Sequence, residues 1–320
     1  TDRYATSHVA GEHNIRIAGL DIHNPVFLIS GLGVVLFVCL TLLFNEQAAV
    51  FFQGLRPMVT SRFDWVFMGA ANLFVLLSIA LVLSPYGNIR LGGPNTKPRY
   101  SFISWVSMLF ASGIGIGIMF YAVLEPMNHF ISISGSAESA ANAAPLGMAL
   151  GTGDDAQRLA MAATLYHWAF HPWAIYAMVG LALAFFCYNK NLPMVIRSAF
   201  YPLLGERVWG WPGHLIDIFA VFATLFGLAT SLGYGAEQAG GGLNYVYEAP
   251  TGNSSNLVVV AVITVMALIS VWRGLDGGIK RLSELNMMMA VVLGVFVLTI
   301  GPTGDILIDI VKNIWAYLVY

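Results

Sequence analysis

The chain has 320 residues, of which 58% are hydrophobic and only 10% are charged, and its mean hydropathy is +0.73. This composition lies outside the range of soluble globular domains and predicts an all-α polytopic membrane protein. The formal net charge of −2 gives no basis for nucleic-acid binding, and Cys39 and Cys187 lie in apolar runs without metal-ligand spacing, so no metal site is expected from them.

Residues 1–24 are polar and lack the apolar core of a signal peptide, so they are expected to form an N-terminal tail. After this tail we expect seven membrane spans, given that a crossing takes about 20 apolar residues. Their ranges are 25–44, 64–84, 101–124, 158–187, 215–247, 257–272 and 285–303. The sixth is short and is expected to borrow residues from its flanks. The segment 304–320 mixes apolar and charged positions and is predicted to begin a helix along the outer membrane surface.

The basic residues indicate how these spans are oriented. Lysine and arginine gather in the loops 85–100, 188–214 and 273–284, which all fall on one side of the predicted membrane. The positive-inside rule assigns that side to the cytoplasm. The N-terminus is therefore expected to be cytoplasmic, and the lipid bilayer is the first predicted partner.

The third span contains three glycines in five residues, Gly113, Gly115 and Gly117. Each glycine costs about 1 kcal/mol relative to alanine inside a helix, so the run marks a place where the helix is expected to unwind. Irregular backbone at membrane depth is tolerated where it lines a cavity, as in the binding sites of secondary transporters. Close helix packing through G-x-x-x-G is the alternative. Glu125-Pro126 is expected to close this span near the outer mouth.

Aromatic residues are concentrated in the fourth span, where Trp168, Trp173 and Tyr176 flank Pro172. Because proline loosens the backbone between them, the three rings are able to converge on one cavity and to bind a quaternary cation through their faces. An aromatic belt at the interface and plain packing are the alternatives. His167 and His171 have i, i+4 spacing, but hydrogen bonding or proton handling is favoured over a metal site because no carboxylate or cysteine accompanies them.

Hydroxyl and acidic groups occur in the fifth span. Thr224, Thr230 and Ser231 offer oxygens to a sodium ion, or they bond back to their own helix. Glu237 and Asp217 are ionisable groups near membrane depth and so are functional candidates, although Asp217 also suits the first turn of a helix.

These motifs together resemble the betaine/choline/carnitine transporter (BCCT) family, and within it the glycine-betaine type. The similarity begins near residue 21, covers nearly all of the remaining chain, and keeps the motifs in order. The matching segments are Ala111 to Phe120 followed by Glu125-Pro126, His167 to Tyr176, Asn191 to Ser198, Phe226 to Gly233, and Lys280 to Asn286.

The resemblance implies a twelve-span transporter with a five-plus-five inverted repeat, the leucine-transporter-like fold. About seven spans would be present here: two peripheral helices with their cytoplasmic loop in 25–100, and the first repeat in 101–303. Residues 304–320 would begin the outer interfacial helix. On this resemblance, the second repeat would lie outside this sequence.

The resemblance also assigns the site. Trp168, Trp173 and Tyr176 match the aromatic box for a trimethylammonium group, and Gly113, Gly115 and Gly117 would complete the substrate site. A neutral residue at 117, where choline-type members tend to have an aspartate, suits a zwitterion that brings its own carboxylate.

The resemblance also implies which residues bind the coupling ion. Carbonyls near Ala111 and Ile114 and the hydroxyl of Thr224 match positions associated with sodium. Leu228 stands where sodium-coupled members carry a second threonine, which weakens one sodium site, and Glu237 is the candidate proton carrier.

The expected function is therefore a secondary symporter of the bacterial cytoplasmic membrane, not an enzyme, that imports glycine betaine by alternating access. A sodium or proton gradient drives it, no cofactor is expected beyond that coupling ion, and the resemblance implies a homotrimer. Dimethylsulfoniopropionate, choline or carnitine are alternative solutes. A solute sensor that does not transport is an alternative function, and a membrane enzyme using His167, His171 and Glu237 is the least favoured one.

Overall fold

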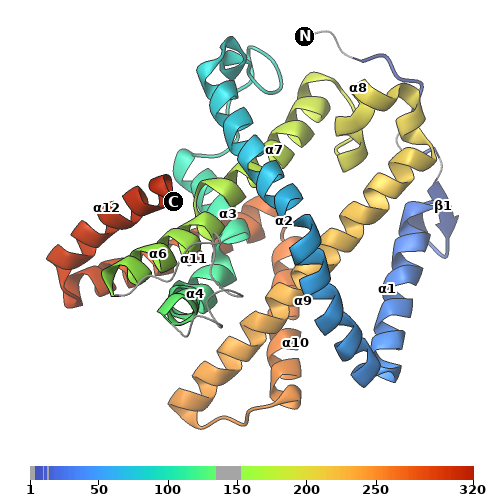
Figure 1. Cartoon of the computed structure of the whole chain (residues 1–320). Coiled ribbons are helices and arrows are strands. Elements are labelled where there is room, and N and C mark those ends of the chain that lie inside the picture. Colours follow the sequence, from blue (N-terminus) through green and yellow to red (C-terminus); the bar gives the residue numbers. More distant parts are fainter. Residues whose placement is uncertain (1–3, 10, 13, 135–152) are drawn as a thin grey trace. The chain divides into compact units, whose positions relative to one another are not determined.

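The computed structural model describes residues 4–9, 11–12, 14–134 and 153–320. The chain forms two compact units, one made of 1–96 with 170–227 and the other of 97–169 with 228–320. Figure 1 shows the elements in sequence colours. The predicted division of the chain into tail, peripheral helices and repeat stays a prediction.

The first unit begins with a β-hairpin that the sequence analysis did not anticipate. Strands β1 (Asn14–Ile17) and β2 (Leu20–His23) pair antiparallel. Ala18 and Gly19 connect them with φ of 51° and 82°, the left-handed conformations that two-residue hairpin turns require. The N-terminal segment is therefore partly ordered.

Helices make up the rest of the first unit. They are α1 (Val26–Leu43), α2 (Asn45–Leu83), α7 (Phe170–Ala184), α8 (Tyr201–Leu204) and the first half of α9 (Trp211–Tyr247), with short turns at η1 (Pro85–Asn88), η3 (Phe185–Asn189), η4 (Ile196–Phe200) and η5 (Gly205–Trp209). Helix α1 matches the predicted span 25–44. Helix α2 begins at Asn45, well before the predicted span 64–84, and continues through Pro57. Helices α2 and α7 pack against each other.

The second unit contains α3 (Phe102–Gly113), α4 (Gly115–Ser134), α6 (Asp154–Trp168), the second half of α9, α10 (Asn253–Trp272), η6 (Leu275–Ile279), α11 (Lys280–Ile300) and α12 (Thr303–Val319). Helix α4 lies against α6, and α12 packs along α6. Small and apolar side chains join α4 to α6, because Ile133 and Phe130 pack on Ala156, Leu159 and Ala160.

Among the described residues, six helical segments have the length and apolar character of a membrane span, which confirms a multi-pass, essentially all-α membrane protein. They are 26–43, 45–83, 154–189, 211–247, 253–272 and 275–300. The sixth predicted span does gain residues at its start, since α10 begins at Asn253. The predicted span 101–124 does not qualify because it is divided at Ile114. The inverted repeat stays a prediction.

A buried polar cluster in the first unit joins β2, η4 and the start of α9. The guanidinium of Arg197 pairs with the carboxylate of Asp217. Its Nη1 and Nη2 lie 3.2 Å from Nδ1 of His214 and 3.1 Å from Nε2 of His23. The Arg197 side chain is only 4% exposed. Asp217 therefore neutralises a buried cation, which gives this predicted functional candidate a structural role.

The N-terminal segment docks on the same unit. The Thr6 and Ser7 hydroxyls each donate to Oε2 of Glu206 at 3.2 Å, and the Tyr201 hydroxyl donates to Oε1 at 2.5 Å. These hydrogen bonds, that from Tyr201 foremost, hold the pKa of Glu206 below its ordinary value. The imidazole of His8 stacks on Trp209 at 4.3 Å between ring centroids.

Candidate functional site

The glycine run does interrupt its helix. Helix α3 ends at Gly113 and α4 begins at Gly115, with Ile114 between them at φ −115° and ψ −21°. The Ile114 N–H still donates to the Phe110 carbonyl at 2.9 Å. The predicted break is therefore present, and it is one residue long.

Gly117 lies three residues after Ile114 and contacts Trp168 of α6. A Cβ atom at 117 would lie 2.2 Å from Cη2 and 2.4 Å from Cζ3 of the indole, whereas a Cβ at Gly115 would meet nothing within 4 Å. Carbon atoms in contact are about 3.5–4.0 Å apart. Only glycine therefore fits at 117 with the indole in this position, and the structure brings these two predicted site residues together.

Tyr121 connects Trp168 to a group of aromatic rings within the second unit. Tyr121 lies 5.8 Å from the Trp168 indole, measured between ring centroids. Phe120 lies 5.0 Å and Tyr121 6.1 Å from Tyr234 of α9. These separations are typical of interacting aromatic pairs. The sequence analysis missed Tyr121 and Tyr234, which lie 47 residues before and 66 residues after Trp168 in the chain.

Glu125 was placed wrongly at the end of a helix. Helix α4 continues to Ser134 with Pro126 in its interior, and the Glu125 side chain is buried. Its Oε2 accepts a hydrogen bond from Nε1 of Trp168 at 2.6 Å, and its Oε1 lies 2.8 Å from Nδ1 of His167. The carboxylate thus belongs to the candidate site. The Glu-Pro pair resembles a helix terminus, so only the packing of α4 on α6 reveals its role.

Trp173 and Tyr176 form a separate pair on α7, with ring centroids 5.8 Å apart. They belong to the first unit and Trp168 to the second, so the box of three rings stays a prediction. His171 of the first unit has Nε2 3.1 Å from Oδ1 of Asn72. In the described part of the chain, no group of three or more potential metal ligands is found.

The residues predicted to bind the coupling ion are not shown to form one site. The Thr224 hydroxyl donates to the Ala220 carbonyl at 2.8 Å, which is the back-bonding alternative from the sequence analysis. Ala111 lies in the last turn of α3, three residues before the break at Ile114. Glu237 is exposed on α9 and makes no hydrogen bond or ion pair within the described residues. The roles of Ala111, Ile114, Thr224 and Glu237 stay predictions.

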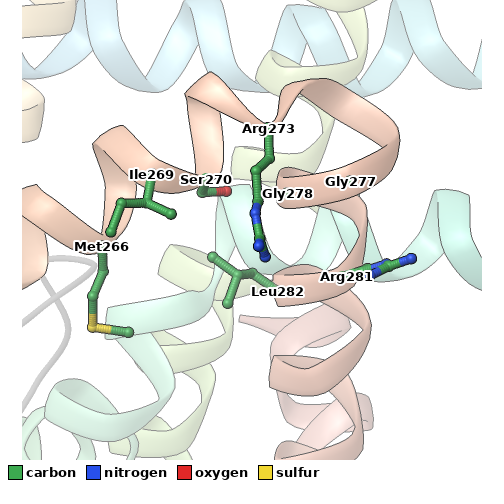
Figure 2. Close-up of a pocket in the computed structure, with 8 residues that line it drawn as sticks. All are labelled: Met266, Ile269, Ser270, Arg273, Gly277, Gly278, Arg281 and Leu282. Carbon is green, nitrogen blue, oxygen red and sulfur yellow. The ribbon is translucent and has the colours of Figure 1, made fainter.

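A cavity of about 220 Å³ elsewhere in the second unit does not match an onium site. Figure 2 shows it between α10, η6 and α11, with Arg273 extending into the space between the helices. Its lining contains Arg273 and Arg281 but no aromatic ring. Two guanidinium groups would repel a trimethylammonium group, so the rings around Trp168 remain the better candidate.

Comparison with known proteins supports the reading of the motifs. The sequence model of the protein family described as "BCCT, betaine/carnitine/choline family transporter" matches residues 25–320. The chain is 51% identical to a glycine betaine/proline/choline transporter of Vibrio parahaemolyticus, over 98% of this chain and 58% of the relative. It is 47% identical to glycine betaine transporter 1 of the same species (94% and 56%) and 37% identical to the high-affinity choline transport protein of Escherichia coli (92% and 42%).

The chain thus spans about half the length of the curated relatives it matches. The matched range runs through both compact units and contains the interrupted helix. On this evidence, the chain belongs to the betaine/carnitine/choline transporter family.

Proposed function

We propose that the protein is a secondary symporter that imports a small methylated onium zwitterion, with glycine betaine as the leading substrate, across the bacterial cytoplasmic membrane. The observation that carries this proposal is the contact of the Trp168 indole with Gly117, next to the first turn of α4. A desolvated quaternary cation gains about 2 kcal/mol or more from an aromatic face. The first turn of a helix favours a carboxylate through its N–H groups and its dipole.

Both ends of a betaine molecule therefore find a matching group in one small region. The ring of Trp168 suits the trimethylammonium group, and the start of α4 suits the carboxylate. Gly117 adds no charge, which fits a zwitterion better than a bare cation. We propose that Trp173 and Tyr176 complete the ring site, that Gly113 and Gly115 give the solute access to the backbone, and that the two repeats rock to give alternating access. The names of the relatives, which include glycine betaine and choline transporters, support this substrate class.

Uptake by the full-length protein in proteoliposomes tests the substrate. We expect labelled betaine to accumulate against its gradient, and the single variants Trp168→Ala, Trp173→Ala and Tyr176→Ala each to raise its KM about tenfold or more. Trp272→Ala is the matched control, because this indole is 89% exposed at the end of α10. An unchanged KM in all three variants would remove the ring site, and saturable binding without accumulation would favour the sensor. Labelled choline, carnitine and dimethylsulfoniopropionate in the same assay rank the alternative solutes.

We propose that an ion gradient supplies the energy, with the carbonyls of Ala111 and Ile114 and the Thr224 hydroxyl as sodium ligands. The Thr224 oxygen keeps a lone pair after donating to Ala220. Thr224→Val should then raise the sodium concentration for half-maximal uptake, and Thr224→Ser should not. Sodium-independent uptake that follows pH and is lost in Glu237→Gln would assign the coupling to protons. A cytoplasmic N-terminus and a homotrimer belong to the same proposal and are tested by cysteine accessibility and by the mass of the purified protein.

A further inference from the structure

The carboxylate of Glu125 lies among the ring nitrogens of Trp168 and two histidines. The Glu125 side chain is about 10% exposed and lies on the face of α4 that packs against α6. Three ring nitrogens surround its carboxylate: Nε1 of Trp168 at 2.6 Å, Nδ1 of His167 at 2.8 Å and Nε2 of His129 at 3.5 Å. Because an indole N–H can only donate, Oε2 must accept from Trp168.

We propose that Glu125 is a positioning residue that sets the affinity of the onium site by holding and polarising the indole of Trp168. The proposal rests on the proposed function, in which that indole binds the methylated ammonium group. Glu125 itself would not contact the solute. It would act through the ring.

The first part of the argument is mechanical. The indole is fixed at two opposite ends, since its Nε1 edge is bound to Glu125 and its Cη2 and Cζ3 atoms lie against Gly117. Tyr121 flanks the same ring with its plane tilted by 40°. A ring that is already fixed loses little further freedom when a ligand binds, and such preorganisation increases affinity.

The second part is electrostatic. An aromatic ring attracts cations because its faces are electron-rich and its edge is electron-poor. A carboxylate that accepts the indole N–H places negative charge at the electron-poor edge and makes the potential above the face more negative. Hydrogen bonds to an ionised partner are also shorter and about twice as strong as neutral ones, and 2.6 Å is a short N–H···O distance.

A double-mutant cycle with the full-length protein separates this role from a purely structural one. The variants are Glu125→Gln, Trp168→Phe and the combination, and the readouts are KM and maximal rate of betaine uptake together with the thermal midpoint. Glutamine keeps an acceptor oxygen but removes the charge, while phenylalanine keeps a ring but removes the N–H. We expect Glu125→Gln to raise KM about tenfold, which corresponds to about 1.4 kcal/mol, with little change in maximal rate. In the Trp168→Phe background the same change should have almost no effect.

Two further variants complete the experiment. Glu125→Asp keeps the charge on a shorter side chain and should recover part of the affinity. It also serves if Glu125→Gln does not fold. Glu248→Gln is the control, because this glutamate is exposed just after α9 and its neutralisation should leave KM unchanged.

The outcomes for the two proposals are distinct. An unchanged KM in Glu125→Gln, or an equal effect of this change with and without the Trp168 indole, would overturn the role of Glu125 even if Trp168→Ala weakens betaine binding. If neither Trp168→Ala nor Trp168→Phe changes KM, the proposed role of Trp168 in binding the solute is wrong, and the inference about Glu125 fails with it.

Discussion

Replacing Gly117 by alanine gives the most direct test of how the site is built. The added Cβ would lie 2.2 Å from Cη2 of Trp168, so the indole must move by about 1.5 Å to reach ordinary carbon contact. Overpacking of this kind costs about 1–3 kcal/mol. The ring is able to relieve the clash by leaving Glu125, and we therefore expect the cost to fall on ligand binding. At 1.4 kcal/mol for each factor of ten, the KM for betaine should rise about 5- to 140-fold.

Stability should respond differently from transport. Alanine is favoured over glycine by about 1 kcal/mol in a helix interior, so the thermal midpoint of Gly117→Ala should change little while uptake falls. Gly294→Ala is the matched control, because Gly294 lies inside α11 with nothing within 4 Å of its virtual Cβ. Combination with Trp168→Phe removes the benzo edge of the indole, and the double variant should then be no worse than Trp168→Phe alone. A KM for Gly117→Ala within twofold of wild type would refute the reasoning.

Two further predictions concern the first unit. Arg197→Met should destabilise the protein by about 3–5 kcal/mol, because it leaves the buried carboxylate of Asp217 uncompensated. The double variant Arg197→Met with Asp217→Leu should recover most of this loss. Thermal unfolding in detergent measures both, and equal unfolding midpoints for the single and double variants would contradict the pairing. The second prediction concerns the hydrogen bonds that hold residues 4–9 on Glu206. They should be fully formed at a pH above the ordinary glutamate pKa of about 4.3. They should be lost as the pH falls through the lower pKa that Glu206 has in the folded protein. The Tyr4 N–H donates to the Lys190 carbonyl at 3.2 Å. Amide exchange at Tyr4, corrected for its intrinsic pH dependence, should therefore be slow at pH 7, and Glu206→Gln should remove this protection. Equal protection in the two proteins would argue against the prediction.

The membrane spans were predictable wherever hydropathy alone decides the structure. Helix α1 starts one residue from the predicted limit at 25, and α10 starts four residues before the predicted limit at 257. The agreement is close because a long apolar segment in lipid can satisfy its backbone hydrogen bonds only as a helix. The start of α2 was not predictable in this way. Its residues 45–63 include Glu46, Arg56 and Pro57, which lower the hydropathy although the helix continues through them.

The hairpin in the N-terminal segment had a readable signal. Residues 14–23 alternate between apolar and polar side chains around Ala18-Gly19, which is the pattern of two strands joined by a tight turn. The partners of Glu125 had no such signal, because Trp168 lies 43 residues further along the chain and reaches it only when α6 packs against α4. Local pattern found the glycine break and the tryptophan, and packing of distant segments decided how they are connected.

The position of Glu125 also bears on which onium solute the site prefers. A buried carboxylate near an aromatic ring would ordinarily be read as the counter-ion of a bare cation such as choline. Its oxygens, however, face the N–H edge of Trp168 and the imidazole of His167, whereas a bound onium group would lie over the ring face. In the proposed site, the charge would therefore make the potential above the ring face more negative without pairing directly with the ligand. Because Gly117 offers no second acid, a solute that brings its own carboxylate to the first turn of α4 would have the advantage, and we therefore expect the site to prefer betaine over choline.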